Sequence, residues 1–149
     1  MKTLLLFLCF YPIQLWAPPA EMSKQDMIKA WEFNYLMNPF TPAQLNSALK
    51  LFVDRPDIAM AQARHESGDF TSAIWKENCN PFGMHHPKIR LTYSTGKNRN
   101  CAVYRHWFYA VLDYAEMQKY YYRKGYDHKY FLQVYCPEKN YRKLVYNLL

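Results

Sequence analysis

Apolar side chains recur at helical spacing through most of this chain of 149 residues. The clearest stretch follows Thr41, Pro42 and Gln44, which supply a cap residue, a proline at the first helical position and a glutamine at the third. Four apolar residues then stand at i, i+3, i+4 and i+7, namely Leu45, Ala48, Leu49 and Phe52. This spacing predicts a helix with one buried face.

Further helices and one hairpin are predicted elsewhere. Ser23 and Asp26 resemble a capping box that opens a helix. The other predicted helices cover about 57–66, 107–122, 130–135 and a last segment that begins at Pro137. The segment 75–88 reads as a loop, and the β-prone runs 89–93 and 101–105 are predicted to pair across 94–100. The expected fold class is mainly helical, with one small hairpin.

Composition narrows the function without deciding it. Half of the residues are hydrophobic and 21% are charged, which excludes a disordered polar chain and a collagen-like repeat. Aromatic residues make up 18%, including 14 tyrosines, which favours a surface that stacks on sugar rings or bases. The net charge of +7 favours polyanionic partners such as nucleic acid, anionic lipid or bacterial wall polymer.

The N-terminus is typical of a targeting segment. Residues 3–16 read TLLLFLCFYPIQLW after Lys2, like the hydrophobic region of a signal peptide, and are shorter than the roughly 20 apolar residues of a membrane-spanning helix. Pro18 makes cleavage after Ala17 or Ala20 unfavourable. We expect export to the periplasm or the exterior, with a targeting or anchoring segment at 1–20 and one domain at 21–149. The alternative is an uncleaved arm that packs on the domain or on a partner subunit.

One face of the third predicted helix combines small and polar residues with a glutamate at its end. Ala59, Gln62, Ala63 and Glu66 follow one another at i, i+3, i+4 and i+7. Desolvation and the negative end of the helix dipole disfavour an ionised carboxylate at the helix C-terminus. Such a group suits a general acid. The alternative is a glutamate that only bonds neighbouring backbone amides.

Four segments carry a family resemblance: AMAQARHESGDFTS (59–72), ENCNPFGMHHP (77–87), YRHWFYAVLDYAEMQKYYY (104–122) and YCPEKNYRKLV (135–145). In order and spacing they resemble the glucosaminidase domain, the endo-β-N-acetylglucosaminidases of glycoside hydrolase family 73, over about residues 54–147. The likeness is closest to compact versions from Bacteroidota and their phages. It implies a lysozyme-like helical fold with a groove beside the hairpin. It also implies hydrolysis of the β-1,4 bond after N-acetylglucosamine in peptidoglycan.

The resemblance also assigns residues. Glu66 matches the family's catalytic acid, and the "N-x-F-G" loop is expected to line the groove. The residues expected to bind substrate or position a water are Asn80, Phe82, Gly83, Tyr93, Tyr104, His106 and Trp107. Asp113 matches a family position too, and we interpret it as a structural hydrogen-bonding residue.

Two departures from the family pattern bear on the mechanism. Trp107 stands where the family commonly has a tyrosine, and residues 78–112 contain no Asp or Glu. A second catalytic carboxylate could then come only from Glu77, Asp69 or Asp113, none of which the motif places well. We therefore favour attack by the substrate's own 2-acetamido group over a water positioned by tyrosine or histidine. A catalytically weak glycan-binding or virion structural protein is the alternative from another class.

The remaining signals are weaker. His65, His85, His86 and Cys79 form no H-E-x-x-H or H-x-x-E-H pattern, so neither a metal nor a cofactor is expected. The tyrosine run 120–122 is better explained by a helical core with a basic rim than by nucleic-acid binding. Cys79 and Cys101 could pair in an oxidising compartment, or stay as unpaired thiols like Cys9 and Cys136. The expected partner is a peptidoglycan strand; contact of 3–16 with a membrane or virion, and the oligomeric state, are left open.

Overall fold

The computed structural model describes residues 23–138 and 140–149. Its elements in chain order are α1 (Lys24–Leu36), α2 (Pro42–Phe52), α3 (Pro56–Glu66), α4 (Ala73–Asn78), β1 (Gly96–Asn98), β2 (Cys101–Val103), α5 (Trp107–Tyr122), α6 (His128–Tyr135) and α7 (Tyr141–Tyr146). The predicted fold class, mainly helical with a small hairpin, is confirmed. The prediction for the N-terminal segment falls outside the described residues.

The helix starts predicted at Ser23 and Thr41 are confirmed in atomic detail. Thr41 Oγ1 accepts a hydrogen bond from the Gln44 backbone N–H at 3.2 Å, and Gln44 Oε1 accepts one from the Thr41 N–H at 3.0 Å. This reciprocal capping box starts α2 after an extended N-cap residue. Ser23 caps α1 by accepting from the Asp26 N–H at 3.2 Å.

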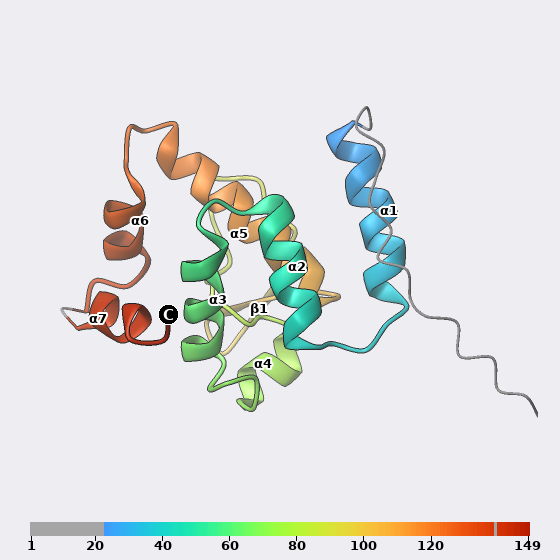
Figure 1. The fold of residues 1–149 in the computed structure, drawn as a ribbon, viewed down its shortest axis with the longest axis horizontal. Coiled ribbons are helices and arrows are strands. Elements are labelled where there is room, and N and C mark those ends of the chain that lie inside the picture. Colours follow the sequence, from blue (N-terminus) through green and yellow to red (C-terminus); the bar gives the residue numbers. More distant parts are fainter. Residues whose placement is uncertain (1–22, 139) are drawn as a thin grey trace, which may run out of the picture.

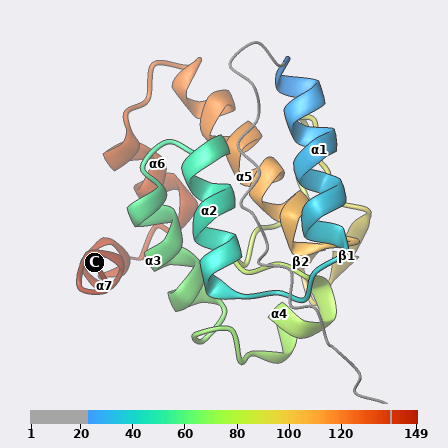
Figure 2. The ribbon, with the colours of Figure 1, turned by 45° about the vertical axis from the view of Figure 1, so that its right-hand side comes forward.

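A central group of helices holds the core. α2 packs against both α3 and α5, and α5 is buried along much of its length. α1 and the α6–α7 pair lie on opposite sides of this group, while α4 and the sheet cover one end (Figures 1 and 2). α7 contacts α3 and α6 contacts α5. α7 therefore packs on α3, the helix that ends at Glu66.

The hairpin differs from the prediction in where its strands lie. β1 and β2 pair antiparallel across a two-residue turn at Arg99 and Asn100, both of which have positive φ. The predicted strand at 89–93 does not form. Ile89 and Leu91 are 81% and 87% exposed, and the carboxylate of Asp113 accepts from the Tyr93 backbone N–H. Contacts with α5 thus replace strand pairing.

Three further predictions concern α4, the start of the last helix and two cysteines. Residues 75–78, predicted as loop, belong to α4, which Ser72 caps by accepting from the Trp75 N–H at 3.2 Å. The last helix begins at Tyr141 rather than at Pro137. Cys79 and Cys101 are free thiols, so the unpaired alternative holds here.

Within the described segments, no helix has the length and apolarity needed to cross a bilayer.

Candidate active site

Glu66 is the last residue of α3 and faces a glycine across a very short gap. It is partly buried, and Gly83 lies directly opposite with φ +64°. A Cβ atom added to Gly83 would come within 2.9 Å of Glu66 Oε2, which is closer than real Cβ atoms approach an oxygen. The left-handed backbone favours glycine at position 83, and a side chain there would displace the end of the Glu66 side chain.

Asn80 shapes the loop that presents Gly83. Its side chain is 1% exposed, and its Nδ2 donates to the carbonyls of Met84 at 2.9 Å and Ala102 at 3.0 Å. Its Oδ1 accepts from the Met84 N–H at 3.2 Å. Because both ends of the amide are occupied, Asn80 ties the 80–84 loop to β2. Phe82 is fully buried, and its carbonyl accepts a hydrogen bond from the Tyr135 hydroxyl.

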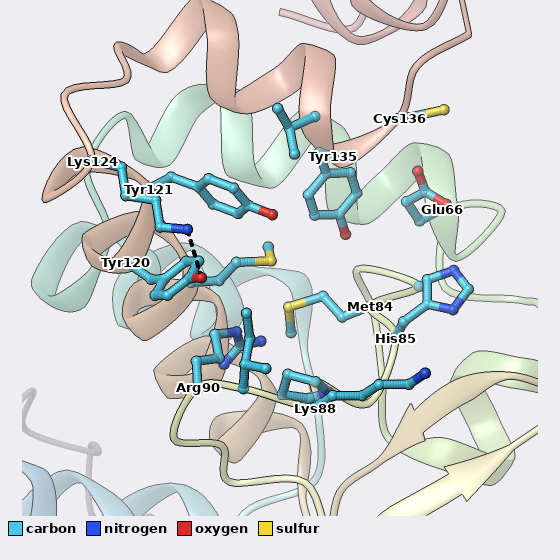
Figure 3. A pocket seen from close by; sticks show the side chains of 15 residues that line it. Glu66, Met84, His85, Lys88, Arg90, Tyr120, Tyr121, Lys124, Tyr135 and Cys136 are labelled. Carbon is cyan, nitrogen blue, oxygen red and sulfur yellow. Dashed lines mark hydrogen bonds between the residues drawn. The ribbon is translucent and has the colours of Figure 1, made fainter.

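A cavity of about 600 Å³ opens beside Glu66 and Gly83 (Figure 3). Its walls come from the 83–90 loop, the C-terminal part of α5 and the end of α6. The lining residues are Glu66, Gly83, Met84, His85, Pro87, Lys88, Ile89, Arg90, Met117, Tyr120, Tyr121, Lys124, Val134, Tyr135 and Cys136. In Figure 3, Glu66 and Tyr135 lie toward one end, while Tyr120 and Lys124 lie toward the other. The cavity thus combines one carboxyl group with aromatic and cationic walls.

Two tyrosines lie near Glu66: Tyr135, which is half-buried, and Tyr141, which is buried. Burial, together with the nearby Glu66 charge, raises the pKa of the Tyr135 phenol well above its usual value. Burial, followed by the nearby Glu66 charge, also raises the pKa of Tyr141, whose hydroxyl accepts from the Gln62 amide at 3.2 Å. Both phenols therefore stay protonated and neutral near the carboxyl group.

Cationic side chains contribute to the cavity wall. Lys124 Nζ donates to the Tyr120 hydroxyl at 2.7 Å and lies 4.3 Å from the centroid of that ring. Lys88 is exposed at the rim. Among the described residues that line the cavity, Glu66 is the only carboxylate.

Asp113 has the structural role predicted for it. It is fully buried and holds Arg90 through contacts of 2.7 and 3.1 Å. It also accepts from the Tyr104 hydroxyl at 2.6 Å, and burial followed by this acidic neighbour raises the pKa of Tyr104. This buried pair anchors the segment that forms one wall of the cavity.

The other two acidic candidates are also paired at a distance from the cavity wall. Glu77 contacts Arg99 at 3.2 Å, and Asp69 contacts Arg64 at 2.9 Å. Neither Glu77, Asp69 nor Asp113 lines the cavity. The described wall therefore offers one carboxyl group for acid–base chemistry.

Several predicted site residues lie outside the cavity lining. Tyr104 and Trp107 are 3% and 2% exposed, and His106 Nδ1 caps α5 by accepting from the Phe108 N–H at 3.2 Å. Tyr93 is 39% exposed and stacks on Tyr109 with 6.3 Å between ring centroids. Of the predicted set, the structure brings Glu66 and Gly83 together at the cavity, with Asn80 and Phe82 supporting the same loop. Substrate contacts by the others stay predictions.

Sequence reasoning missed the aromatic side of the cavity. Tyr120 and Tyr121 belong to the tyrosine run that the sequence analysis assigned to a helical core with a basic rim. Tyr135 and Tyr141 lie about 70 residues after Glu66 in the chain. The resemblance of 135–145 to the closing segment of the family domain is the available signal for the second pair.

Across 23–138 and 140–149, no group of three or more His, Cys, Asp or Glu side chains is arranged to hold a metal ion.

Comparison with known proteins agrees with the resemblance. The family model described as mannosyl-glycoprotein endo-beta-N-acetylglucosaminidase matches residues 44–149. No curated protein and no solved structure gives a significant match. Because the match covers well over half of the chain and includes Glu66, Gly83 and the whole cavity wall, the chain belongs to the glucosaminidase family, whose domain supports hydrolase activity on peptidoglycan.

Proposed function

We propose that this protein cleaves the β-1,4 glycosidic bond after N-acetylglucosamine in peptidoglycan, with Glu66 as the general acid. One observation carries the proposal: Glu66 is the sole carboxylate on the described wall of a cavity of about 600 Å³ in a glucosaminidase domain. Because Gly83 has no side chain, the space beside Glu66 Oε2 that a Cβ atom would take stays open.

The proposed reaction uses the substrate's own acetamide. Glu66 donates its proton to the glycosidic oxygen while the bond between that oxygen and C1 breaks. The carbonyl oxygen of the 2-acetamido group bonds to C1 from the opposite face and forms a cyclic oxazolinium ion. Water then adds to C1, the Glu66 carboxylate takes one proton from that water, and the ring reopens to the acetamide.

The pairing of the other acids supports substrate assistance. A water-attack mechanism would need a base carboxylate about 6.5–9.5 Å from the acid, and a protein nucleophile would lie at about 5–5.5 Å. Glu77, Asp69 and Asp113 each hold a cation instead. The competing route uses a water placed by Tyr93, Tyr104 or His106. The two routes differ in stereochemistry, because assistance retains the β anomer and direct attack by water inverts it.

The cavity walls suggest how a glycan is held. Tyr121 and Tyr135 line the same cavity as Glu66, and their aromatic rings offer apolar surface for packing against a sugar ring. The cationic rim favours retention on an anionic wall polymer. The proposed setting is an exported enzyme, acting as an autolysin, a phage lysin or a virion-borne wall-opening factor.

Digestion of purified peptidoglycan tests the proposal. Wild-type protein is expected to release fragments that end in reducing N-acetylglucosamine, with the β anomer formed first as seen by proton NMR. Glu66→Gln removes the transferable proton and should lower turnover by at least about 100-fold. Glu77→Gln is the matched control, because it makes the same change at an exposed carboxylate and should leave turnover within about twofold.

Other outcomes separate the alternatives. Fragments that end in reducing N-acetylmuramic acid would make the protein a muramidase. Intact glycan with bound protein would favour the glycan-binding or virion structural alternative, for which the single carboxylate on the described cavity wall is the supporting observation. A Glu66→Gln protein that digests as fast as wild type would remove Glu66 from the acid role.

A further inference from the structure

The end of the cavity away from Glu66 carries a lysine that one aromatic ring holds in place. Lys124 Nζ donates a hydrogen bond to the Tyr120 hydroxyl at 2.7 Å and lies 4.3 Å from the centroid of the same ring (Figure 3). Both residues line the cavity. These two contacts restrain a side chain that otherwise has much rotamer freedom to lose when it binds a ligand.

The Tyr120 ring is itself anchored to the core through a neighbouring ring. Tyr120 is half-buried, and it meets Tyr121 edge to face with 5.4 Å between the ring centroids. Tyr121 in turn contacts the fully buried Phe131, with 5.9 Å between centroids. Packing against the core therefore sets where the lysine and the phenol stand in the cavity wall.

This pair offers hydrogen-bond donors to a ligand in the cavity. A phenolic oxygen that accepts one hydrogen bond still has its own proton to donate, and an ammonium group has three protons, of which one goes to Tyr120. Within the described segments, neither side chain donates to a further acceptor or pairs with a carboxylate. Arg90, another cation of the cavity wall, differs in this respect, because Asp113 already holds its guanidinium group at 2.7 Å.

An adjacent phenol and ammonium group suit the two oxygens of a carboxylate, and hydrogen bonds to a charged acceptor are the strong ones. We propose that Tyr120 and Lys124 form a subsite for a carboxylate that the substrate carries beside its sugar chain. This inference rests on the proposed function, in which the scissile bond lies at Glu66 and the substrate extends along the cavity. In peptidoglycan, the carboxylate belongs to the peptide stem, or to the lactyl group of N-acetylmuramic acid where the stem has been removed.

Soluble glycan fragments of equal length test this subsite. Three forms are compared: fragments with intact stems, fragments freed of their stems, and stem-bearing fragments whose carboxylates have been converted to amides. Wild-type kcat/KM should be about 10-fold higher on a form that supplies the carboxylate than on the amidated form. A preference for the stem-bearing form alone assigns the subsite to the stem, and one that the stem-free form shares assigns it to the lactyl group.

Variants connect this preference to the two residues. The measured quantity is the ratio of kcat/KM on the carboxylate form to kcat/KM on the amidated form, so a general loss of activity cancels. Lys124→Gln should lower this ratio to near one, and Tyr120→Phe, which keeps the ring but loses the hydroxyl, should lower it part of the way. Lys50→Gln is the matched control, because it removes the same charge from an exposed position outside the cavity lining and should keep the wild-type ratio. A wild-type ratio near one would overturn the proposal, as would equal effects of Lys124→Gln and Lys50→Gln.

Direct binding separates failure of the subsite from failure of the proposed function. Wild-type protein that releases no reducing N-acetylglucosamine from any fragment would contradict the proposed function. Calorimetric titration with the same fragments then tests the subsite by itself. Tighter binding of a carboxylate form, lost in Lys124→Gln, would support the subsite, and equal affinity of wild-type protein for the amidated form would overturn it.

Discussion

Gly83 controls how closely the 80–84 loop approaches the candidate acid. Replacing it with alanine places a methyl group 2.9 Å from Glu66 Oε2, so either the carboxyl group or the loop must move. A displacement of about 1 Å at a reacting group can cost about 100-fold in rate. We expect Gly83→Ala to lower kcat on peptidoglycan by at least about 10-fold while the protein stays folded.

Gly125→Ala provides the control for this prediction. Gly125 also has a positive φ, of 80°, but no atom lies within 4 Å of the position that an added methyl group would take. Both variants therefore incur a similar left-handed backbone cost of about 1–2 kcal/mol, which thermal unfolding measures. Equal activity in the two variants would show that the short approach to Glu66 has no catalytic consequence.

At the scale of elements, the ion pair of Asp113 and Arg90 joins α5 to the wall segment that includes Lys88 and Ile89. The side chains of the pair are 0% and 8% exposed. Breaking such a buried pair typically costs about 3–5 kcal/mol. Asp113→Asn should lower the free energy of unfolding by about 3 kcal/mol in denaturant titrations, and lower activity by loosening the wall.

Asp57→Asn is the matched comparison, because Asp57 pairs with Arg55 at a surface where both side chains are 49% exposed. Exposed ion pairs contribute about 0–1 kcal/mol to the free energy of unfolding, so Asp57→Asn should lower it by no more than this amount. Asp113→Asn should also keep more turnover than Glu66→Gln when both are assayed well below their unfolding temperatures. Turnover as low as that of Glu66→Gln in a fully folded protein would instead assign Asp113 to the chemistry.

The contacts of Asp113 also separate the elements that could be predicted from the sequence from those that could not. Helices such as α2 and α5 are specified by the local spacing of apolar residues and by caps. Their positions could therefore be predicted, and the structure confirms them. The 89–93 segment has strand propensity, but a residue of α5 twenty positions later satisfies its backbone. Motifs predict Glu66 and Gly83. They do not predict the nearby phenols of Tyr135 and Tyr141, because only tertiary packing brings α6 to α5 and α7 to α3.

At the scale of the whole molecule, the net charge of +7 should act on substrate capture rather than on bond cleavage. The Debye length falls from about 10 Å at 0.1 M salt to about 3 Å at 1 M, so attraction to an anionic wall weakens between these conditions. We expect KM for intact cell wall to rise with salt. Cleavage of a short uncharged chitooligosaccharide should change little over the same range.

The position of a positive charge should affect wall binding as well as the net charge of the molecule. Two lysines at different places on the surface separate these effects. Lys88 lies on the cavity rim, whereas Lys50 is an exposed residue of α2 that does not line the cavity. Lys88→Gln and Lys50→Gln remove the same charge from the molecule. Attraction focused at the rim predicts that Lys88→Gln raises the low-salt KM for wall several-fold more than Lys50→Gln, and that the difference disappears at high salt. Equal effects of the two variants would mean that wall binding depends on net charge alone, with the glycan guided to Glu66 by the aromatic walls.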